Sequence, residues 1–320
     1  GIRLHNKTIL DKPITFDINP AFSSKTNNLI GSGALIMNEN YRNSSLYTIR
    51  YALSGSYFHY APNASYSKIT PSVEFRIREA DLRDNRKQSF MARQVMVNRE
   101  QSELNSFDLT ENYSIFNFRY SNSKTEVTHH FSSLTDVQFA RNFGKIASEI
   151  EYRKLFENNR QIDIRFYTGV FLFNTTNSDF FSFGLDRPTD YLFDYGFYGR
   201  SESSGFFSQQ YIQSEGGFKS KLNQSFSNQW ISTINGSFNI WNWIELYGDI
   251  GYLKNRHSKG QFLYDSGLRL NLVTDYFEVY FPLYSSNGFE PLQNSYNEKI
   301  RFVLTLSPAT LINLFNRKWF

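Results

Sequence analysis

Strict alternation of apolar and polar residues in two neighbouring stretches limits this chain to a small set of folds. From residue 244 to 252 the even positions are mostly apolar and the odd positions mostly polar: Ile244, Leu246, Gly248, Ile250 and Tyr252 against Glu245, Tyr247, Asp249 and Gly251. After a polar turn the period returns, with Tyr264, Leu268, Leu270 and Leu272 against Asp265, Gly267, Arg269 and Asn271. A period of two predicts β-strands. A strand of a soluble sandwich usually has about 5–6 residues, whereas one that crosses a bilayer needs about 9–11. The length of these stretches therefore indicates transmembrane β-strands.

The composition excludes several other classes of protein. The mean hydropathy is −0.49 and 18% of the 320 residues are aromatic, while no apolar run reaches the about 18 residues of a transmembrane helix. So many aromatics suit the lipid-facing band of a barrel.

The chain has no cysteine, which excludes disulfides and thiolate metal sites. Its 34 basic and 30 acidic residues are interleaved, so nucleic acid is not an expected partner. Because the chain opens at Gly1 without a signal-peptide pattern, we expect a mature protein or a fragment.

The complete pattern predicts an all-β fold, a closed antiparallel transmembrane β-barrel of about fourteen strands, with twelve to sixteen as the range. The barrel domain covers residues 1–320. Short turns are expected on the periplasmic side, together with both termini. These turns are Ser121 to Lys124, Glu157 to Asn159, Trp241-Asn242 and Thr274-Asp275.

Charged residues at inward positions of the strands are the first candidate site. They are Glu74, Arg76, Arg78, Glu149, Glu151, Arg153, Asp163, Arg165, Glu245, Asp249, Asp265, Arg269, Glu278, Lys299 and Arg301. A selective pore or a substrate-binding lumen would use such residues. The two signs are nearly balanced, however, which favours cross-strand charge pairs that fill the interior.

Catalytic and metal-binding motifs are not found. The neighbouring His129 and His130 would point to opposite faces of a strand, and no His-Glu-x-x-His or Gly-x-Ser-x-Gly motif occurs. A barrel hydrolase would leave almost no local motif, so catalysis stays open. We assign no catalytic, cofactor-binding or metal-ligating residue and expect no cofactor in this chain.

Residues 175–228 break the strand pattern and are too long for an ordinary connection. They carry many aromatics: Phe180, Phe181, Phe183, Tyr191, Phe193, Tyr195, Phe197, Tyr198, Phe206 and Phe207. A loop bathed in water would not gather so many, because exposed apolar patches usually mark contact sites. We predict a large extracellular loop that folds compactly across the barrel mouth as a plug, or that docks a partner. A mobile loop without a role is the alternative.

Residues 308–320 predict a short C-terminal amphipathic helix. Pro308 suits its first turn. One face would lie at the membrane interface, formed by Leu311, Leu314, Phe315 and Trp319.

Several long segments resemble one family, the C-terminal outer-membrane barrel of large Bacteroidota proteins of the gluzincin, aminopeptidase-like metallopeptidase type. The segments are residues 74–100, 149–165, 187–202, 207–220, 239–251, 277–290 and 299–320. The resemblance implies a barrel that tethers a peptidase-like region preceding it. That region and its His-Glu-x-x-His are not in this chain, so zinc and any peptidase activity would belong to the absent part.

These observations together predict an outer-membrane barrel of a Gram-negative, Bacteroidota-like bacterium that acts as a membrane anchor and scaffold. The expected partners are outer-membrane lipid and lipopolysaccharide, and an envelope protein complex. A transport channel and the membrane domain of an active zinc aminopeptidase are the alternatives.

Overall fold

The computed structural model describes residues 1–8, 12–24, 26–42, 44–61, 63–79, 84–101, 112–176, 179–195, 205–273 and 276–304. Most of these residues lie in one antiparallel sheet of sixteen strands, beside a separate sheet of two strands. The predicted all-β fold with one large antiparallel sheet is therefore confirmed. Within the described residues, no helix has the length and apolar character needed to cross a membrane.

The large sheet contains β1 (Leu4–His5), β2 (Ile14–Ser23), β3 (Asn28–Asn40), β4 (Leu46–Ala61), β5 (Ala64–Ile77), β6 (Lys87–Arg99), β7 (Asn112–Thr125), β8 (His129–Ala140), β9 (Phe143–Leu155), β10 (Gln161–Asn174), β13 (Trp230–Trp241), β14 (Ile244–Lys254), β15 (Gln261–Val273), β16 (Phe277–Ser285), β17 (Gly288–Phe289) and β18 (Arg301–Leu304). The small sheet pairs β11 (Phe183–Gly184) with β12 (Phe226–Ser227). The described residues also include the short 3-10 helices η2 (Phe206–Gln209), η3 (Glu290–Leu292) and η4 (Tyr296–Glu298).

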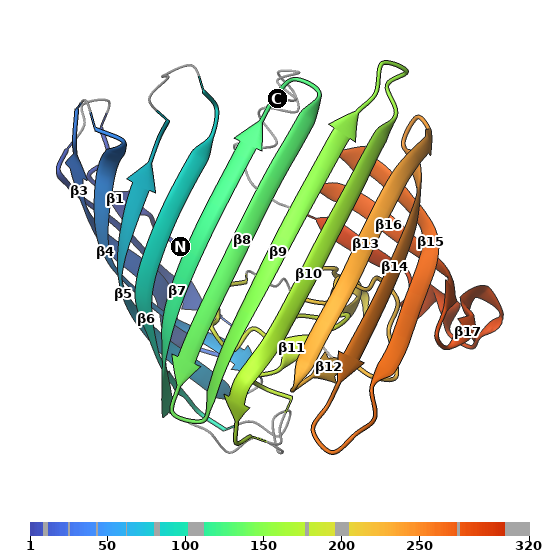
Figure 1. Cartoon of the computed structure of the whole chain (residues 1–320). Coiled ribbons are helices and arrows are strands. Elements are labelled where there is room, and N and C mark those ends of the chain that lie inside the picture. Colours follow the sequence, from blue (N-terminus) through green and yellow to red (C-terminus); the bar gives the residue numbers. More distant parts are fainter. Residues whose placement is uncertain are drawn as a thin grey trace.

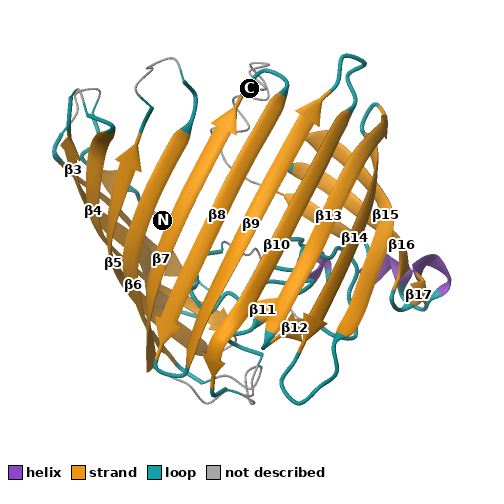
Figure 2. Cartoon of the chain, viewed as in Figure 1, coloured by secondary structure: helices purple, strands orange, loops and turns teal. Residues whose placement is uncertain are grey.

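Consecutive strands are neighbours throughout the sheet, and β10 pairs directly with β13 across the long intervening segment. The sheet curls around an interior (Figure 1), and the loops of residues 179–195 and 205–228 lie inside this curl (Figure 2). The sixteen strands fall at the upper end of the predicted range because β1 and β17 add two-residue pieces at its margins. Among the described residues, β1 and β18 are not paired with each other, so barrel closure stays a prediction.

The alternation seen in the sequence separates the two faces of the sheet. In β14, Ile250 is 46% exposed on the outside of the curl, whereas its neighbour Asp249 is only 1% exposed. The register pairs Ile250 with Ile234 on β13 and with Tyr264 on β15. Apolar outer residues therefore meet across adjacent strands.

One predicted turn is wrong. Ser121 to Lys124 lie inside β7, which runs on to Thr125. The polar run stays in the strand because its groups have partners across the sheet: the hydroxyls of Ser89 and Ser121 are 2.8 Å apart.

The predicted turn at Glu157 to Asn159 lies between β9 and β10, where Asn159 has a φ of 59°. Trp241 ends β13, and Asn242 turns the chain with a φ of 43°. The predicted turn at Thr274-Asp275 and the predicted helix at 308–320, with Leu311, Leu314, Phe315 and Trp319, lie outside the described residues.

If the exposed apolar face meets lipid, a charge placed on it should be costly. The Ile250→Arg variant should lose about 2–4 kcal/mol of the free energy of unfolding in lipid vesicles, because the guanidinium would enter hydrocarbon. Denaturant titration followed by tryptophan fluorescence measures this. The volume-conserving Ile250→Leu control should cost less than about 1.5 kcal/mol. Equal stability of the arginine and leucine variants would contradict a lipid-facing position.

Candidate functional site

The candidate site is the interior of the curl, where the inner segment packs against the strands; this name refers to the described residues 175–176, 179–195 and 205–228. Phe181 lies 5.0 Å from Phe143 of β9, measured between ring centroids, and Phe183 lies 5.0 Å from Phe171 of β10. All four rings are buried. These contacts fix the first part of the inner segment to the middle of the sheet.

A lysine of the wall, which is the part of the large sheet that surrounds the inner segment, lies inside this aromatic cluster. Lys145 of β9 is buried, and its Nζ lies 4.5 Å from the ring centroid of Phe183 and 4.7 Å from that of Tyr191. The same Nζ donates a hydrogen bond of 3.3 Å to the carbonyl of Phe181. Desolvated cation–π contacts of this kind are worth about 2 kcal/mol or more, so Lys145 anchors the inner segment by charge as well as by packing.

Asp194 forms a second anchor. Each of its two carboxylate oxygens forms an ion pair with the wall: one with Lys68 of β5 at 2.8 Å, the other with Arg93 of β6 at 2.7 Å. Lys68 also donates to the carbonyls of Leu192 and Phe193. Two neighbouring strands therefore hold one turn of the inner segment by its backbone and by its side chain.

The ring of Phe193 stacks on Tyr66 of β5 with centroids 3.8 Å apart. On the neighbouring β7 and β8, Tyr113 donates to the carbonyl of Tyr191 at 2.5 Å, and the hydroxyl of Tyr191 donates to Gln138 at 2.6 Å. The contacts thus continue strand by strand across the first half of the sheet.

The second part of the inner segment is bound by the C-terminal strands. Lys219 pairs with Asp249 of β14 at 2.6 Å. Asp265 of β15 accepts hydrogen bonds from the backbone N–H groups of Lys219, at 2.8 Å, and Ser220, at 2.6 Å. In β18, Arg301 pairs with Asp186 at 3.1 Å. Strands from both halves of the sheet therefore hold the inner segment.

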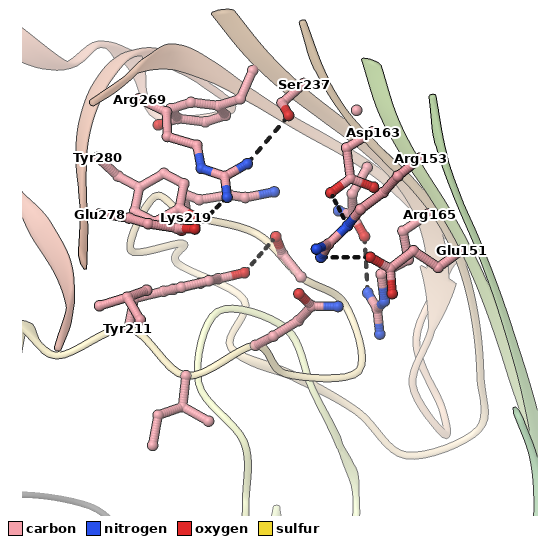
Figure 3. A pocket seen from close by; sticks show the side chains of 17 residues that line it. Glu151, Arg153, Asp163, Arg165, Tyr211, Lys219, Ser237, Arg269, Glu278 and Tyr280 are labelled. Atoms are coloured by element: carbon pink, nitrogen blue, oxygen red, sulfur yellow. Dashed lines mark hydrogen bonds and ion pairs between the residues drawn. The ribbon is translucent and has the colours of Figure 1, made fainter. Parts of the chain in front are cut away.

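A cavity of about 270 Å³ remains between this second part and the wall (Figure 3). Arg153 faces it with Glu151 at 2.6 Å and Asp163 at 3.0 Å. Arg269 faces it with Glu245 at 3.1 Å and also pairs with Glu278. Each arginine is balanced by carboxylates from its own or the next strand, so the cavity offers paired charges rather than a single-sign binding surface.

The predicted charges occupy the interior to different depths. Seven are buried: Arg165, Glu245, Asp249, Asp265, Arg269, Glu278 and Arg301. Eight are half-buried: Glu74, Arg76, Arg78, Glu149, Glu151, Arg153, Asp163 and Lys299. Most meet an opposite charge, as Arg76 meets Glu74 at 2.9 Å and Arg165 meets Glu149 at 2.7 Å. Lys299 pairs with Glu290 of η3 at 2.5 Å, a residue outside the predicted set. Arg78 lies over the ring of Tyr47.

The aromatics of the inner segment divide into two groups. Five pack in the interior: Phe180, Phe181, Phe183, Tyr191 and Phe193. Tyr195, Phe206 and Phe207 are exposed, although the rings of Phe206 and Phe207 contact each other with centroids 5.7 Å apart and Phe206 stacks on Phe302 with centroids 4.4 Å apart. Phe206 and Phe207 both lie in η2. Phe197 and Tyr198 lie outside the described residues.

Sequence reasoning missed the cations and acids that hold the inner segment. Lys68, Arg93 and Lys145 share the parity of inward residues on their own strands, so the alternation itself could have placed them inside. Asp194 and Lys219 lie in a stretch where apolar and polar residues do not alternate, so no sequence pattern marks them.

No family model matches this chain, and no curated protein matches its sequence. The interior therefore has to be interpreted from its own geometry. Within the described residues, no group of three or more His, Cys, Asp or Glu side chains is arranged to hold a metal ion. What the geometry provides is a set of anchors that hold a folded segment inside a sheet.

Removing the Asp194 carboxylate should weaken this attachment. The Asp194→Asn variant leaves Lys68 and Arg93 facing a neutral amide and should lose about 1.5–3 kcal/mol, the value of hydrogen bonds to charged groups. Near-ultraviolet circular dichroism during denaturation measures the loss. As a control, Glu126→Gln removes only exposed pairs with Lys124 and His129 and should cost about 0–1 kcal/mol. Equal effects of both variants would refute the anchor.

A buried acid of the inner segment should make its stability depend on pH. Glu215 accepts a hydrogen bond from the backbone N–H of Gly184 at 3.0 Å. Burial raises the pKa of the Glu215 carboxyl above its usual value, although the ammonium of Lys145 opposes the rise. The folded protein therefore holds this proton more tightly than the unfolded chain does.

Stability should consequently fall as the pH rises through and above the usual range for a glutamate. The Glu215→Gln variant keeps an acceptor for Gly184 but has no proton to lose, so this part of the decline should vanish. Denaturation midpoints of both proteins between about pH 4 and 8 test the prediction. Parallel pH profiles would show that Glu215 titrates normally.

Proposed function

We propose that this chain is an outer-membrane barrel that serves as a membrane anchor and scaffold, with its lumen closed by the inner segment. The observation that carries the proposal is the reversed polarity of the sheet. Its outer face exposes large apolar side chains on strand after strand, whereas its inner face buries paired charges. A water-soluble sheet would place these groups the other way round, but a sheet in lipid needs this arrangement.

The exposed apolar residues extend around the sheet rather than forming one patch. They include Leu35, Leu53, Ile69, Phe90, Phe116, Phe118, Ile150, Ile164, Val170, Ile234, Leu246, Ile250 and Leu272. A patch for one protein partner would cover a few strands, whereas a lipid-facing belt has to cover them all. Trp241 and Trp243 are exposed at the turn between β13 and β14, where a barrel places its interfacial aromatics.

Barrel closure belongs to this proposal. Hydrocarbon offers no hydrogen-bond partners, so a sheet edge left bare in the membrane would be too costly. The curl of the sheet in Figure 1 supports a barrel, and its two margins have to be covered in some way.

The scaffold role is favoured over a channel by the way the inner segment is held. Its contacts come from β5, β6, β7, β8, β9, β10, β14, β15 and β18. A gate that opens for a solute has to be detachable, but this segment is attached on both sides of the lumen. Outer-membrane lipid and lipopolysaccharide would then be the immediate partners, together with an envelope complex or a peptidase-like region.

Replacing the inner segment should open the lumen. Residues 174 and 228 lie side by side, since the amide of Asn174 donates to the carbonyl of Asn228 at 3.1 Å. A short Gly-Ser linker can therefore replace residues 180–227 without moving β10 or β13.

In planar bilayers the shortened protein should conduct ions, whereas the complete chain should not. If both conduct equally, the complete chain is a channel and the closed scaffold is refuted. If neither conducts while the shortened chain still folds, the inner segment is not what closes the lumen. Loss of a co-purifying protein from a closed barrel would instead assign the segment to docking.

A further inference from the structure

The cavity between the inner segment and the wall is lined by three tyrosines among the described residues, and they use their hydroxyls differently. Tyr211 donates to the carbonyl of Gly217 at 3.1 Å, and Tyr280 donates to Glu278 at 2.5 Å. The hydroxyl of Tyr247 has no hydrogen-bond partner within the described part of the chain, although this side chain is only 4% exposed. Because an unpaired hydroxyl is costly to bury, the hydroxyl of Tyr247 is a candidate to bind a ligand in the cavity.

Two buried arginines of the wall line the same cavity. The terminal nitrogens of Arg165 donate to Asn235 at 2.8 Å and to Glu149 at 2.7 Å, and those of Arg269 donate to Glu245 at 3.1 Å. The Nε–H group of each arginine is buried and has no hydrogen-bond partner among the residues that the structure describes. Together with the tyrosine hydroxyl, these two N–H groups can donate to a ligand that offers oxygen acceptors.

The charges around the cavity disfavour an ionic ligand. Arg153 pairs with Glu151 at 2.6 Å and with Asp163 at 3.0 Å, and Lys219 pairs with Asp249 at 2.6 Å. An added anion would lie near these carboxylates, and an added cation would lie near the arginine and the lysine, so either would be buried close to like charge. The carboxylates keep lone pairs that can accept from a hydroxyl. The cavity therefore suits a neutral ligand that both donates and accepts hydrogen bonds.

The two sides of the cavity differ in chemistry. Tyr211 and Tyr280 lie on one side in Figure 3, and Arg153 and Glu151 lie on the other. The ring centroid of Tyr280 is 5.1 Å from that of Tyr211 and 5.6 Å from that of Tyr247, so the three rings form one aromatic group. The cavity volume of about 270 Å³ is slightly smaller than the about 300–1,000 Å³ of pockets for drug-sized ligands. A single small ring fits these dimensions better than a long chain does.

We propose that this cavity binds one ring of a neutral saccharide. A sugar ring combines hydroxyls, which donate and accept, with C–H groups that pack against aromatic rings. The hydroxyl of Tyr247 and the Nε–H groups of Arg165 and Arg269 donate to its oxygens, while the carboxylates accept from its hydroxyls. The inference goes beyond the scaffold role, because it depends only on the contacts that surround the cavity.

The test uses the complete chain in detergent. Equilibrium dialysis measures binding of the radiolabelled probes glucose, galactose, mannose and N-acetylglucosamine, and at least one of them should bind at a single site. The uronic acid and the 2-amino sugar derived from the sugar that binds carry a negative and a positive charge. Both should bind at least about tenfold more weakly, since each would be placed near like charge.

The Tyr247→Phe variant separates binding from folding. It removes a hydroxyl without a partner among the described residues, so the unfolding midpoint should not fall, while the affinity for the sugar should drop about tenfold. The control Tyr252→Phe removes a hydroxyl from the exposed face of the same strand, β14, and should change neither quantity.

Three results would each overturn the proposal. If none of the sugars binds, the cavity holds water only. If Tyr247→Phe binds the sugar as tightly as the wild type, the tyrosine hydroxyl does not contact the ligand. If the charged derivatives bind as tightly as the neutral sugar, the site does not select a neutral ligand.

Discussion

Pairing of backbone groups is the constraint on which the rest of this structure depends. In the proposed membrane barrel, a strand surrounded by hydrocarbon cannot form hydrogen bonds with water, so each N–H and C=O has to find a partner in the protein. The long ladders between consecutive strands meet this demand with few register shifts, as between β14 and β15. In such a barrel the same demand would fall hardest on the two margins of the sheet, one of which carries the short strand β1 along β2.

In the interior, the constraint is the burial of charged side chains. Charges that line a lumen lose water when a folded segment fills it, and an unpaired buried charge would be very costly. Arg269 illustrates the solution, because carboxylates of β14 and β16 surround it. Lys145 illustrates a second solution, in which aromatic faces and a backbone carbonyl contact the ammonium directly. Filling the interior is therefore compatible with stability only because the wall and the inner segment are matched residue by residue.

The fold was largely accessible from sequence, since polarity in a strand repeats every two residues and each inward position can be counted from its neighbours. Asp249 and Arg269 were found in this way. Within the inner segment no period exists, so only composition could be used there. Its aromatics predicted packing: Phe183 is fully buried, whereas Phe206 stacks on Phe302 but remains exposed. Contacts such as Asp194 with Lys68 join residues far apart in the sequence, and no local pattern encodes them. The turn placed at Ser121 to Lys124 failed because serine and asparagine suit a polar inner face as well as a turn.

The position of the inner segment in the chain has a consequence for the order of assembly. Its partners Lys68, Arg93 and Lys145 are synthesised before it, whereas Asp249, Asp265 and Arg301 come after it. The hydrogen bond between Lys68 and Asp194 spans 126 residues, and that between Arg301 and Asp186 spans 115. Contacts of such separation form slowly, because a large loop has to be closed first. Since the contacts to both halves of the sheet span similar separations, the inner segment reaches its final place only when strands from both halves are in position.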